Sequence, residues 1–244
     1  DVDVRQKEGI SSAIGVLAGE QPSDRVEIEE NGHRFLVDIW QGHKTGFYLD
    51  QSENRAAIKA WVQREANSDS TVLNAFSFTG GFAVYALAGG AGKVINVDAS
   101  ADALDMARHN LRINGFPAED DEFVEGDVFE VLRYYRDSRR TFDLIVLDPP
   151  KFAKTSRQVN RASRGYKDIN LLALRLLNPG GALATFSCSG AISEDLFQKI
   201  VFGALVDSGR EAQIVRRLGQ SPDHPVALTF PEGAYLKGLL CRVW

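Results

Sequence analysis

The chain has 244 residues and a formal net charge of −5, with 44% hydrophobic and 25% charged residues, a balance that is typical of globular domains. This length accommodates one full α/β domain and a small appendage, and the sequence has no run of about 18 apolar residues that could cross a membrane. The negative charge excludes attraction of the whole surface to phosphate, so any nucleic-acid contact requires a local basic patch or a further domain.

The N-terminal part, residues 1–49, differs in pattern from the rest of the chain. We expect a short helix over residues 3–17. Two alternating segments follow at Val26–Glu29 and Phe35–Asp38, and Asn31-Gly32 between them favours a tight hairpin turn. We therefore predict a small helix and β-hairpin appendage, too short for a core of its own. We expect no leader peptide within this sequence; because it starts at Asp1 instead of Met, we interpret it as a fragment in which upstream targeting signals would not be seen.

Residues 50–244 alternate helical patterns with short apolar runs, which fit buried parallel strands. Strict alternation of this kind predicts a doubly wound, mostly parallel sheet with right-handed crossovers. The predicted strands are Thr71–Ala75, Lys93–Val97, Glu122–Val124, Phe142–Leu147 and Ala182–Phe186, with two further candidates at Ala212–Val215 and Leu236–Val243. The predicted helices are Glu53–Ala66, Phe82–Ala88, Ala101–Asn114, Val128–Tyr135 and Ile169–Leu177.

Glycines and acids follow the first three strands, at the edge where open α/β sheets bind ligands. Gly80 and Gly81 allow a sharp turn and close approach of a ligand, although such a pair also fits a simple tight turn. Asp98 ends the second strand, where a carboxylate can accept two ribose hydroxyls. Asp127 can bond an adenine amino group, cap the next helix, or do both. Because no pyrophosphate-binding glycine pattern is present, a nucleoside without phosphate, such as S-adenosylmethionine, fits best.

The fourth strand runs into Asp148-Pro149-Pro150-Lys151-Phe152. Two prolines after a buried strand hold the backbone extended and fix Asp148 at the strand tip. An Asp-Pro-Pro element followed by an aromatic residue is typical of methyltransferases that act on nucleobases. The carboxylate or nearby carbonyls would bind the base edge, and Phe152 would offer a face for stacking. The alternative is a Pro-Pro turn with a capping Asp.

Cys188 follows the fifth strand, and we expect it beside Asp148. Carbon-5 of a pyrimidine needs activation before it can take a methyl group. A thiolate that adds to carbon-6 provides this activation, so a cysteine nucleophile would serve catalysis here. The alternative is a small buried hydrophobe, which is our interpretation of Cys241 in the last strand.

Basic residues gather after the Asp-Pro-Pro element and predict contacts with RNA phosphates. The alternative is a solvated loop face. The cluster comprises Lys151, Lys154, Arg157, Arg161, Arg164 and Lys167, with Tyr166 among them. Elsewhere, four histidines and two cysteines show no metal-ligand spacing, so we predict no metal. The two distant cysteines indicate a reducing, cytoplasmic setting, and a homodimer is left open.

Several strings together resemble the ribosomal large-subunit RNA methyltransferase I family, which makes 5-methylcytosine in large-subunit ribosomal RNA. The match covers nearly the whole chain. Its strings are Gly42–Gln51 with Asn54-Arg55, Phe-Ser-Phe-Thr-Gly-Gly at 76–81, Leu-Asp-Pro-Pro-Lys-Phe at 147–152, Ser-Cys-Ser-Gly at 187–190, Asp223-His224-Pro225 and Tyr235–Gly238.

The resemblance implies a Rossmann-like class I methyltransferase that uses S-adenosylmethionine and acts on RNA. It implies a cofactor pocket, with Asp148 also catalytic and Cys188 in the place of the nucleophile. The implied cofactor residues are Arg55, Phe76, Thr79, Gly80, Gly81, Asp98, Asp127 and Asp148, and the implied RNA contacts are Lys151, Phe152, Lys154 and Arg157.

Two features depart from related enzymes. We expect the N-terminal RNA-binding PUA domain common in the family to be missing from residues 1–244. Other RNA cytosine methyltransferases have a second cysteine directly after Asp-Pro-Pro, where this chain has Lys151. The base that would release the enzyme from a covalent adduct therefore stays unassigned.

Three other functions remain open on the same residues. A methyltransferase of exocyclic base nitrogens also uses an acid-Pro-Pro-aromatic element and needs no cysteine. A methyltransferase of proteins or small molecules would share the fold. A catalytically silent, cofactor-binding RNA-interaction module would retain Asp148 and Cys188 without using them.

Overall fold

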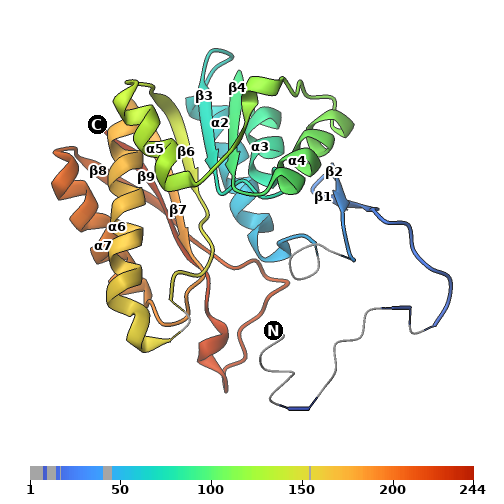
Figure 1. Cartoon of the computed structure of the whole chain (residues 1–244). Helices are drawn as coiled ribbons and strands as arrows, with labels where there is room; N and C mark the ends of the chain where they lie inside the picture. Colours follow the sequence, from blue (N-terminus) through green and yellow to red (C-terminus); the bar gives the residue numbers. More distant parts are fainter. Residues whose placement is uncertain (1–7, 10–14, 17, 41–45, 154) are drawn as a thin grey trace.

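The computed structural model describes residues 8–9, 15–16, 18–40, 46–153 and 155–244. Within these residues, helices cover both faces of a seven-stranded sheet, and a separate two-stranded sheet lies near the N-terminus (Figure 1). The predicted doubly wound α/β fold with a small β-appendage is therefore confirmed. The helix expected over residues 3–17 falls mostly outside the described residues.

The large sheet has the strand order β5-β4-β3-β6-β7-β9-β8. Its first five strands are parallel to one another, whereas β9 pairs antiparallel to both β7 and β8. The strands are β3 (Thr71–Ala75), β4 (Lys93–Asp98), β5 (Phe123–Glu125), β6 (Phe142–Leu147), β7 (Leu177–Ser187), β8 (Ala212–Gly219) and β9 (Lys237–Val243). Two strands that are neighbours in the centre, β3 and β6, are separated in sequence, so chain order reverses between them. This is where open α/β sheets bind ligands.

Helices from the first and second halves of the described domain cover opposite faces of the sheet (Figure 1). On one face lie α2 (Ser52–Glu65), α3 (Gly81–Ala88) and α4 (Ala101–Ile113), and on the other lie α5 (Val128–Asp137), α6 (Val159–Leu176) and α7 (Glu194–Ser208). Alternate residues of the central strands feed the two cores, as Val72 and Leu73 do. Burial on both faces explains why the strands read as continuous apolar runs.

The appendage is a hairpin of β1 (Val26–Glu30) and β2 (His33–Val37). Asn31 and Gly32 have φ values of 51° and 77°, the left-handed backbone that this tight turn requires. Phe35 is fully buried in the core on the α2–α4 side. The hairpin therefore obtains its hydrophobic contacts from the larger domain.

Three elements differ from the predictions. Helix α6 begins at Val159, ten residues before the predicted 169–177 segment, because the basic residues 161–167 form its first turns. Strand β7 begins at Leu177, since pairing with Phe142 passes through an irregularity before Leu144. Helix α7 was not predicted. Ser193 caps its start and Gly209 ends it in the left-handed conformation.

Candidate active site

The loop after β3 has an unusual backbone. Phe76 and Phe78 have positive φ values of 58° and 46°, and Gly80 follows with 77°. Left-handed conformations of bulky residues cost about 1–3 kcal/mol each and are concentrated at functional sites. A Cβ at Gly80 would lie 2.8 Å from the Cβ of Ala107 on α4. Glycine is therefore required at position 80 for two reasons: its positive φ and its close contact with α4.

Asp98 joins the first two strand tips. Its Oδ2 accepts a hydrogen bond from the Phe78 backbone N–H at 2.8 Å, and its Oδ1 accepts one from the Ser100 N–H at 3.0 Å. Asp98 is only partly buried. A carboxylate oxygen has room for a second donor, so this side chain can hold the loop and still receive two hydroxyls.

Arg55 lies against the same loop, but its guanidinium is occupied. It is 3% exposed, and it donates from Nε and Nη2 to both carboxylate oxygens of Glu30, at 2.7 and 2.6 Å. A further bond runs from Nη2 to the Tyr48 carbonyl at 3.0 Å. A Cβ at Gly81 would approach the Arg55 Cδ to 3.1 Å. Arg55 thus links the hairpin, the Tyr48 segment and the glycine loop.

Two other predicted cofactor residues have clear backbone roles. Thr79 is buried, and its carbonyl accepts a hydrogen bond from the Asn110 side chain at 2.9 Å. Asp127 is exposed and caps α5, since its Oδ1 accepts from the N–H groups of Phe129 and Glu130 at 2.8 and 3.2 Å. The capping role considered for Asp127 is therefore confirmed, and an adenine contact stays a prediction.

Asp148 and Cys188 come together as the sequence predicts for neighbouring strand tips. The Asp148 N–H donates to the Ala75 carbonyl at 3.4 Å, which joins the tips of β6 and β3. The Cys188 Sγ lies 4.0 Å from the Pro149 carbonyl oxygen. Cys188 is partly exposed and forms no disulfide. A thiol that solvent can reach thus lies against the Asp-Pro-Pro element.

The pKa of the Tyr48 phenol responds to several charged groups of the site. Burial, followed by the negative charges of Asp148 and Cys188, raises the pKa of its phenol to about 12. Its ring meets Phe78 edge-on, with the ring centres 5.1 Å apart. Asp98 adds a smaller effect in the same direction. The cofactor-side acid and the acceptor-side residues therefore surround one phenol.

Residues 3–242 match a family model that is described as S-adenosylmethionine-dependent methyltransferase. The chain belongs to this methyltransferase family. The match spans both the strained loop and the Cys188 turn, so the strand-tip cluster lies entirely within the family region.

Curated relatives of this methyltransferase chain are longer than the chain. It is 55% identical over 242 residues to the Ribosomal RNA large subunit methyltransferase I of Aeromonas salmonicida, covering 99% of the chain and 60% of that protein. It is 54% identical over 244 residues to the protein of the same name from Shewanella amazonensis, again covering 60% of that protein. The chain thus spans about three fifths of the length of these relatives.

A solved structure shows the same fold. A crystal structure of a methyltransferase candidate in complex with SAH superposes with a TM-score of 0.80 at 25% identity, over 93% of this chain and 58% of that one. SAH is what remains of S-adenosylmethionine after methyl transfer. The Rossmann-like methyltransferase architecture of this chain is therefore shown.

The strand-tip residues fit S-adenosylmethionine on chemical grounds. Its adenosine carries two neutral ribose hydroxyls, which are donors suited to the remaining lone pairs of Asp98. The buried Ser77 hydroxyl has no hydrogen-bond partner among the described residues, so a polar group is available in the glycine loop. Asp98, Ser77 and the loop at 76–81 are the residues that would hold the cofactor.

The proposed RNA face is only partly basic in the structure. Lys151 and Arg157 are exposed, whereas Lys154 lies outside the described residues. Lys167 forms an ion pair with Asp207 at 2.7 Å. Tyr166, which the sequence placed among the surface bases, is fully buried, because one face of α6 packs on the sheet. Its inclusion in an RNA surface was wrong.

Phe152 is packed among protein aromatics. Its ring centre lies 4.6 Å from that of Tyr166 and 5.9 Å from that of Phe129. Phe76 adds an edge contact at 6.5 Å. Phe152 therefore braces the Asp-Pro-Pro element against α5 and α6, and stacking on a base stays a prediction.

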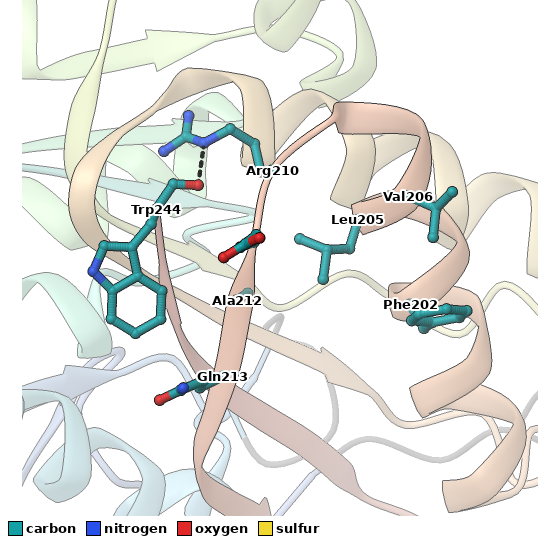
Figure 2. A pocket seen from close by; sticks show the side chains of 8 residues that line it. Phe202, Leu205, Val206, Arg210, Ala212, Gln213 and Trp244 are labelled. Atoms are coloured by element: carbon teal, nitrogen blue, oxygen red, sulfur yellow. Dashed lines mark hydrogen bonds between the residues drawn. The ribbon is translucent and has the colours of Figure 1, made fainter.

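A groove of about 520 Å³ lies far from the strand tips, where α7 meets β8 (Figure 2). Phe202 and Val206 of α7 line it and are 63% and 60% exposed. Arg210 donates from Nε to the Trp244 carbonyl at 2.8 Å beside it. Its lining mixes apolar side chains with the polar Arg210, Glu211 and Gln213, and Glu211 is the one carboxylate among these lining residues.

Two further kinds of feature are absent from the part of the chain that the structure describes. No group of three or more His, Cys, Asp or Glu side chains there is arranged to bind a metal ion. No helix in the same part of the chain combines the length and apolar character needed to span a membrane.

Sequence reasoning missed several site residues. Tyr48, Asp50, Tyr235 and Lys237 all lie near the Cys188 turn, and all belong to family strings that carried no assigned role. Tyr235 donates from its hydroxyl to Asp50 Oδ2, and Asp50 is 4% exposed. The signal that could have indicated these site residues was the presence of polar side chains within the family strings at 42–51 and 235–238.

Proposed function

We propose that the chain transfers a methyl group from S-adenosylmethionine to carbon-5 of a cytosine in large-subunit ribosomal RNA, through a covalent adduct with Cys188. The observation that carries this proposal is the partly exposed Cys188 thiol, whose Sγ lies 4.0 Å from the Pro149 carbonyl of the Asp-Pro-Pro element. The names of the relatives support ribosomal RNA as the substrate. Enzymes that modify exocyclic nitrogens have no use for such a thiol.

The chemistry requires a nucleophile, a held base and a proton acceptor. The Cys188 thiolate adds to carbon-6 of cytosine, and the electron pair of the carbon-5–carbon-6 double bond moves to carbon-5. S-adenosylmethionine supplies an electrophilic methyl group, which carbon-5 attacks. A base then removes the carbon-5 proton, the double bond re-forms, and the thiolate leaves. The described residues offer no proton acceptor that the geometry singles out.

Asp148 would hold the cytosine edge. A carboxylate is the usual acceptor for the cytosine amino group, and Asp148 follows a fully buried strand whose position is fixed by pairing on both sides. Two prolines after it keep the exit path extended. A fixed acceptor holds the ring in one orientation, because it needs no reorganisation when the base binds.

RNA binding and cell setting are parts of the same proposal. Lys151, Lys154 and Arg157 would contact phosphates next to the pocket. The hairpin region 1–49 would act as an appendage of the methyltransferase domain at 50–244, since Phe35 is buried in that domain's core. Two free cysteines, one of them partly exposed, agree with a reducing cytoplasm.

Nucleoside mass spectrometry tests the proposal. Ribosomal RNA from cells that lack the full-length protein should lose one 5-methylcytidine, and the wild-type gene should restore it, whereas Cys188→Ala should not. Cys241→Ala is the matched control and should restore it, because that thiol is buried inside β9. Loss of an N-methylated base instead would assign the chain to exocyclic nitrogen chemistry.

A further inference from the structure

Lys237 is a buried lysine beside the Cys188 turn. It is the first residue of β9 and pairs with Ser187 of β7. Its side chain is 7% exposed. The ammonium Nζ donates to the carbonyl oxygens of Ser189 and Ile192, at 2.8 and 2.6 Å. Lys237 therefore reaches across the sheet end and closes the turn that carries Cys188.

This placement is costly for a lysine. A buried ammonium loses hydration, and carbonyl oxygens replace it only in part. Burial accordingly lowers the pKa of Lys237, whereas the nearby Cys188, when ionised, raises it. Among the described residues, no carboxylate lies within ion-pair distance of Lys237. The cysteine is the first of the charged groups that favour the ammonium, ahead of Glu194.

Hydroxyl groups already fix the same turn without charge. The Tyr166 hydroxyl lies 3.0 Å from both the Ser187 and the Ser189 hydroxyl oxygens. The Ser189 hydroxyl oxygen also accepts from the Ala153 N–H at 3.2 Å. Because this network holds the backbone, a lysine is not needed merely to order the turn.

Apart from the solvent-exposed Lys151, the other ionisable groups around the thiol do not favour a thiolate. Tyr48, Tyr166 and Tyr235 contribute neutral phenols from three different segments, and each has its pKa raised, first by burial. Asp50, bonded to Tyr235, and Asp148 contribute negative charge. Lys151 is exposed to solvent, and Glu194 stands on the far side at the start of α7. Lys237 provides the buried positive charge.

We propose that Lys237 is a positioning residue for the nucleophile, because its ammonium is bonded to the Ser189 and Ile192 carbonyls of the turn that follows Cys188 and supplies a buried positive charge beside the Cys188 thiolate. The inference rests on the proposed role of Cys188 in catalysis. A cation beside a cysteine stabilises the reactive thiolate over the thiol. With Lys237 in place, a larger fraction of the enzyme is ready to attack carbon-6.

The rate of Cys188 alkylation by iodoacetamide, measured against pH without RNA, tests this role. A Cys241→Ala background leaves one thiol to modify. In that protein the midpoint should lie below the ordinary cysteine value of about 8.5. Lys237→Met and Lys237→Gln should each raise the midpoint by roughly one unit, a tenfold loss of thiolate at neutral pH. Lys237→Arg should bring it back towards the parent.

Coincident midpoints in the parent and in folded Met and Gln variants would overturn the proposal. So would a parent midpoint at or above the ordinary value, a result that needs no substitution at Lys237 and survives any failure of the variants to fold. Failure of the proposed function is read separately. If a Cys188→Ala protein still methylates RNA, Cys188 is not the nucleophile, whatever the alkylation profile shows.

Discussion

The two cysteines of this chain lie in two regions that differ in every property relevant to chemistry. Cys188 is partly exposed at the end of β7, where charged and phenolic side chains converge. Cys241 lies inside β9, one strand away, opposite Leu183. Burial alone raises the pKa of its thiol to about 12. The two thiols therefore differ in exposure although they are neighbours in one sheet, since Cys188 follows the end of β7 and Cys241 lies inside β9.

Two surface regions of the molecule also differ. The groove at α7 and β8 is lined in part by exposed apolar side chains such as Phe202. The strand tips combine a strained loop with Asp98 and Asp148. Converging polar groups therefore distinguish the strand tips, where we propose that the reaction takes place, from the groove.

Removal of the Cys188 thiol should have the largest effect. Cys188→Ala should lower methyl transfer to ribosomal RNA by about a thousandfold or more, because carbon-5 loses its activation. Affinity for S-adenosylmethionine should change little. Cys241→Ala should retain activity within about twofold. The measurement is incorporation of labelled methyl groups into RNA, and an active Cys188→Ala protein would break the contrast between the two cysteines.

Asp148→Asn should follow, with a rate loss of roughly a hundredfold. The amide keeps the shape of the side chain but weakens the hydrogen bond that would hold the cytosine amino group in position for attack. Asp143 at the opposite end of β6 is the matched control, since its oxygens accept from Thr71 N–H and the Asn178 side chain. Single-turnover kinetics should show a normal rate for Asp143→Asn, provided that it is folded. Equal losses for the two variants would argue against a special role for the strand tip.

Asp98→Ala should weaken binding of S-adenosylmethionine by about 1.5–3 kcal/mol, the magnitude of hydrogen bonds to a charged group. The variant also loses the bonds to the Phe78 and Ser100 N–H groups, so its thermal stability must be measured alongside. Asp102→Ala on the exposed first turn of α4 is the control. Calorimetry that gives equal affinities for the two variants would remove Asp98 from the cofactor site.

The RNA contacts should produce a smaller, salt-dependent effect. The isolated chain should bind ribosomal RNA weakly at physiological salt, because its net charge is −5. Lys151→Ala and Arg157→Ala should each reduce the slope of log affinity against log salt by about 1. Arg216→Ala on the exposed face of β8 should leave the slope unchanged. Tight binding by the isolated chain, or equal slopes in all three variants, would contradict this division of surfaces.

A substitution in the groove should matter least. Phe202→Ser should leave cofactor affinity and the single-turnover rate within about twofold, and it should change stability by about 0.5 kcal/mol at most, because the side chain is 63% exposed. Calorimetry and a melting curve provide both values. A large loss of activity would show that this region is coupled to the strand tips.

Much of the fold was predictable from local pattern. β3 and β6 match their predicted bounds because buried strands show as apolar runs ended by Gly, Asp or Pro. Helix α7 was missed because apolar residues on its exposed side, such as Phe202 and Val206, obscure the helical periodicity. Its capping residues, Ser193 and Gly209, were the readable signal.

The site was predictable only in part, because strand order decides which tips meet. Asp98, Asp148 and Cys188 follow parallel strands, so their convergence could be inferred before the structure was known. Tyr48 and Lys237 could not be placed in this way. Tyr48 precedes α2, the first long helix of the domain. Lys237 belongs to β9, an antiparallel strand that lies beside β7.

The central claim is that Cys188 forms a covalent bond with cytosine. In the most direct test, the chain is incubated with S-adenosylmethionine and ribosomal RNA that contains 5-fluorocytosine. The products are then analysed by denaturing electrophoresis and peptide mass spectrometry. Fluorine occupies the place of the proton that must leave, so the adduct cannot resolve. We expect a stable protein–RNA complex, linked at Cys188, that Cys241→Ala retains and Cys188→Ala loses. Methylation of normal RNA by the same preparation without any trapped complex would contradict it.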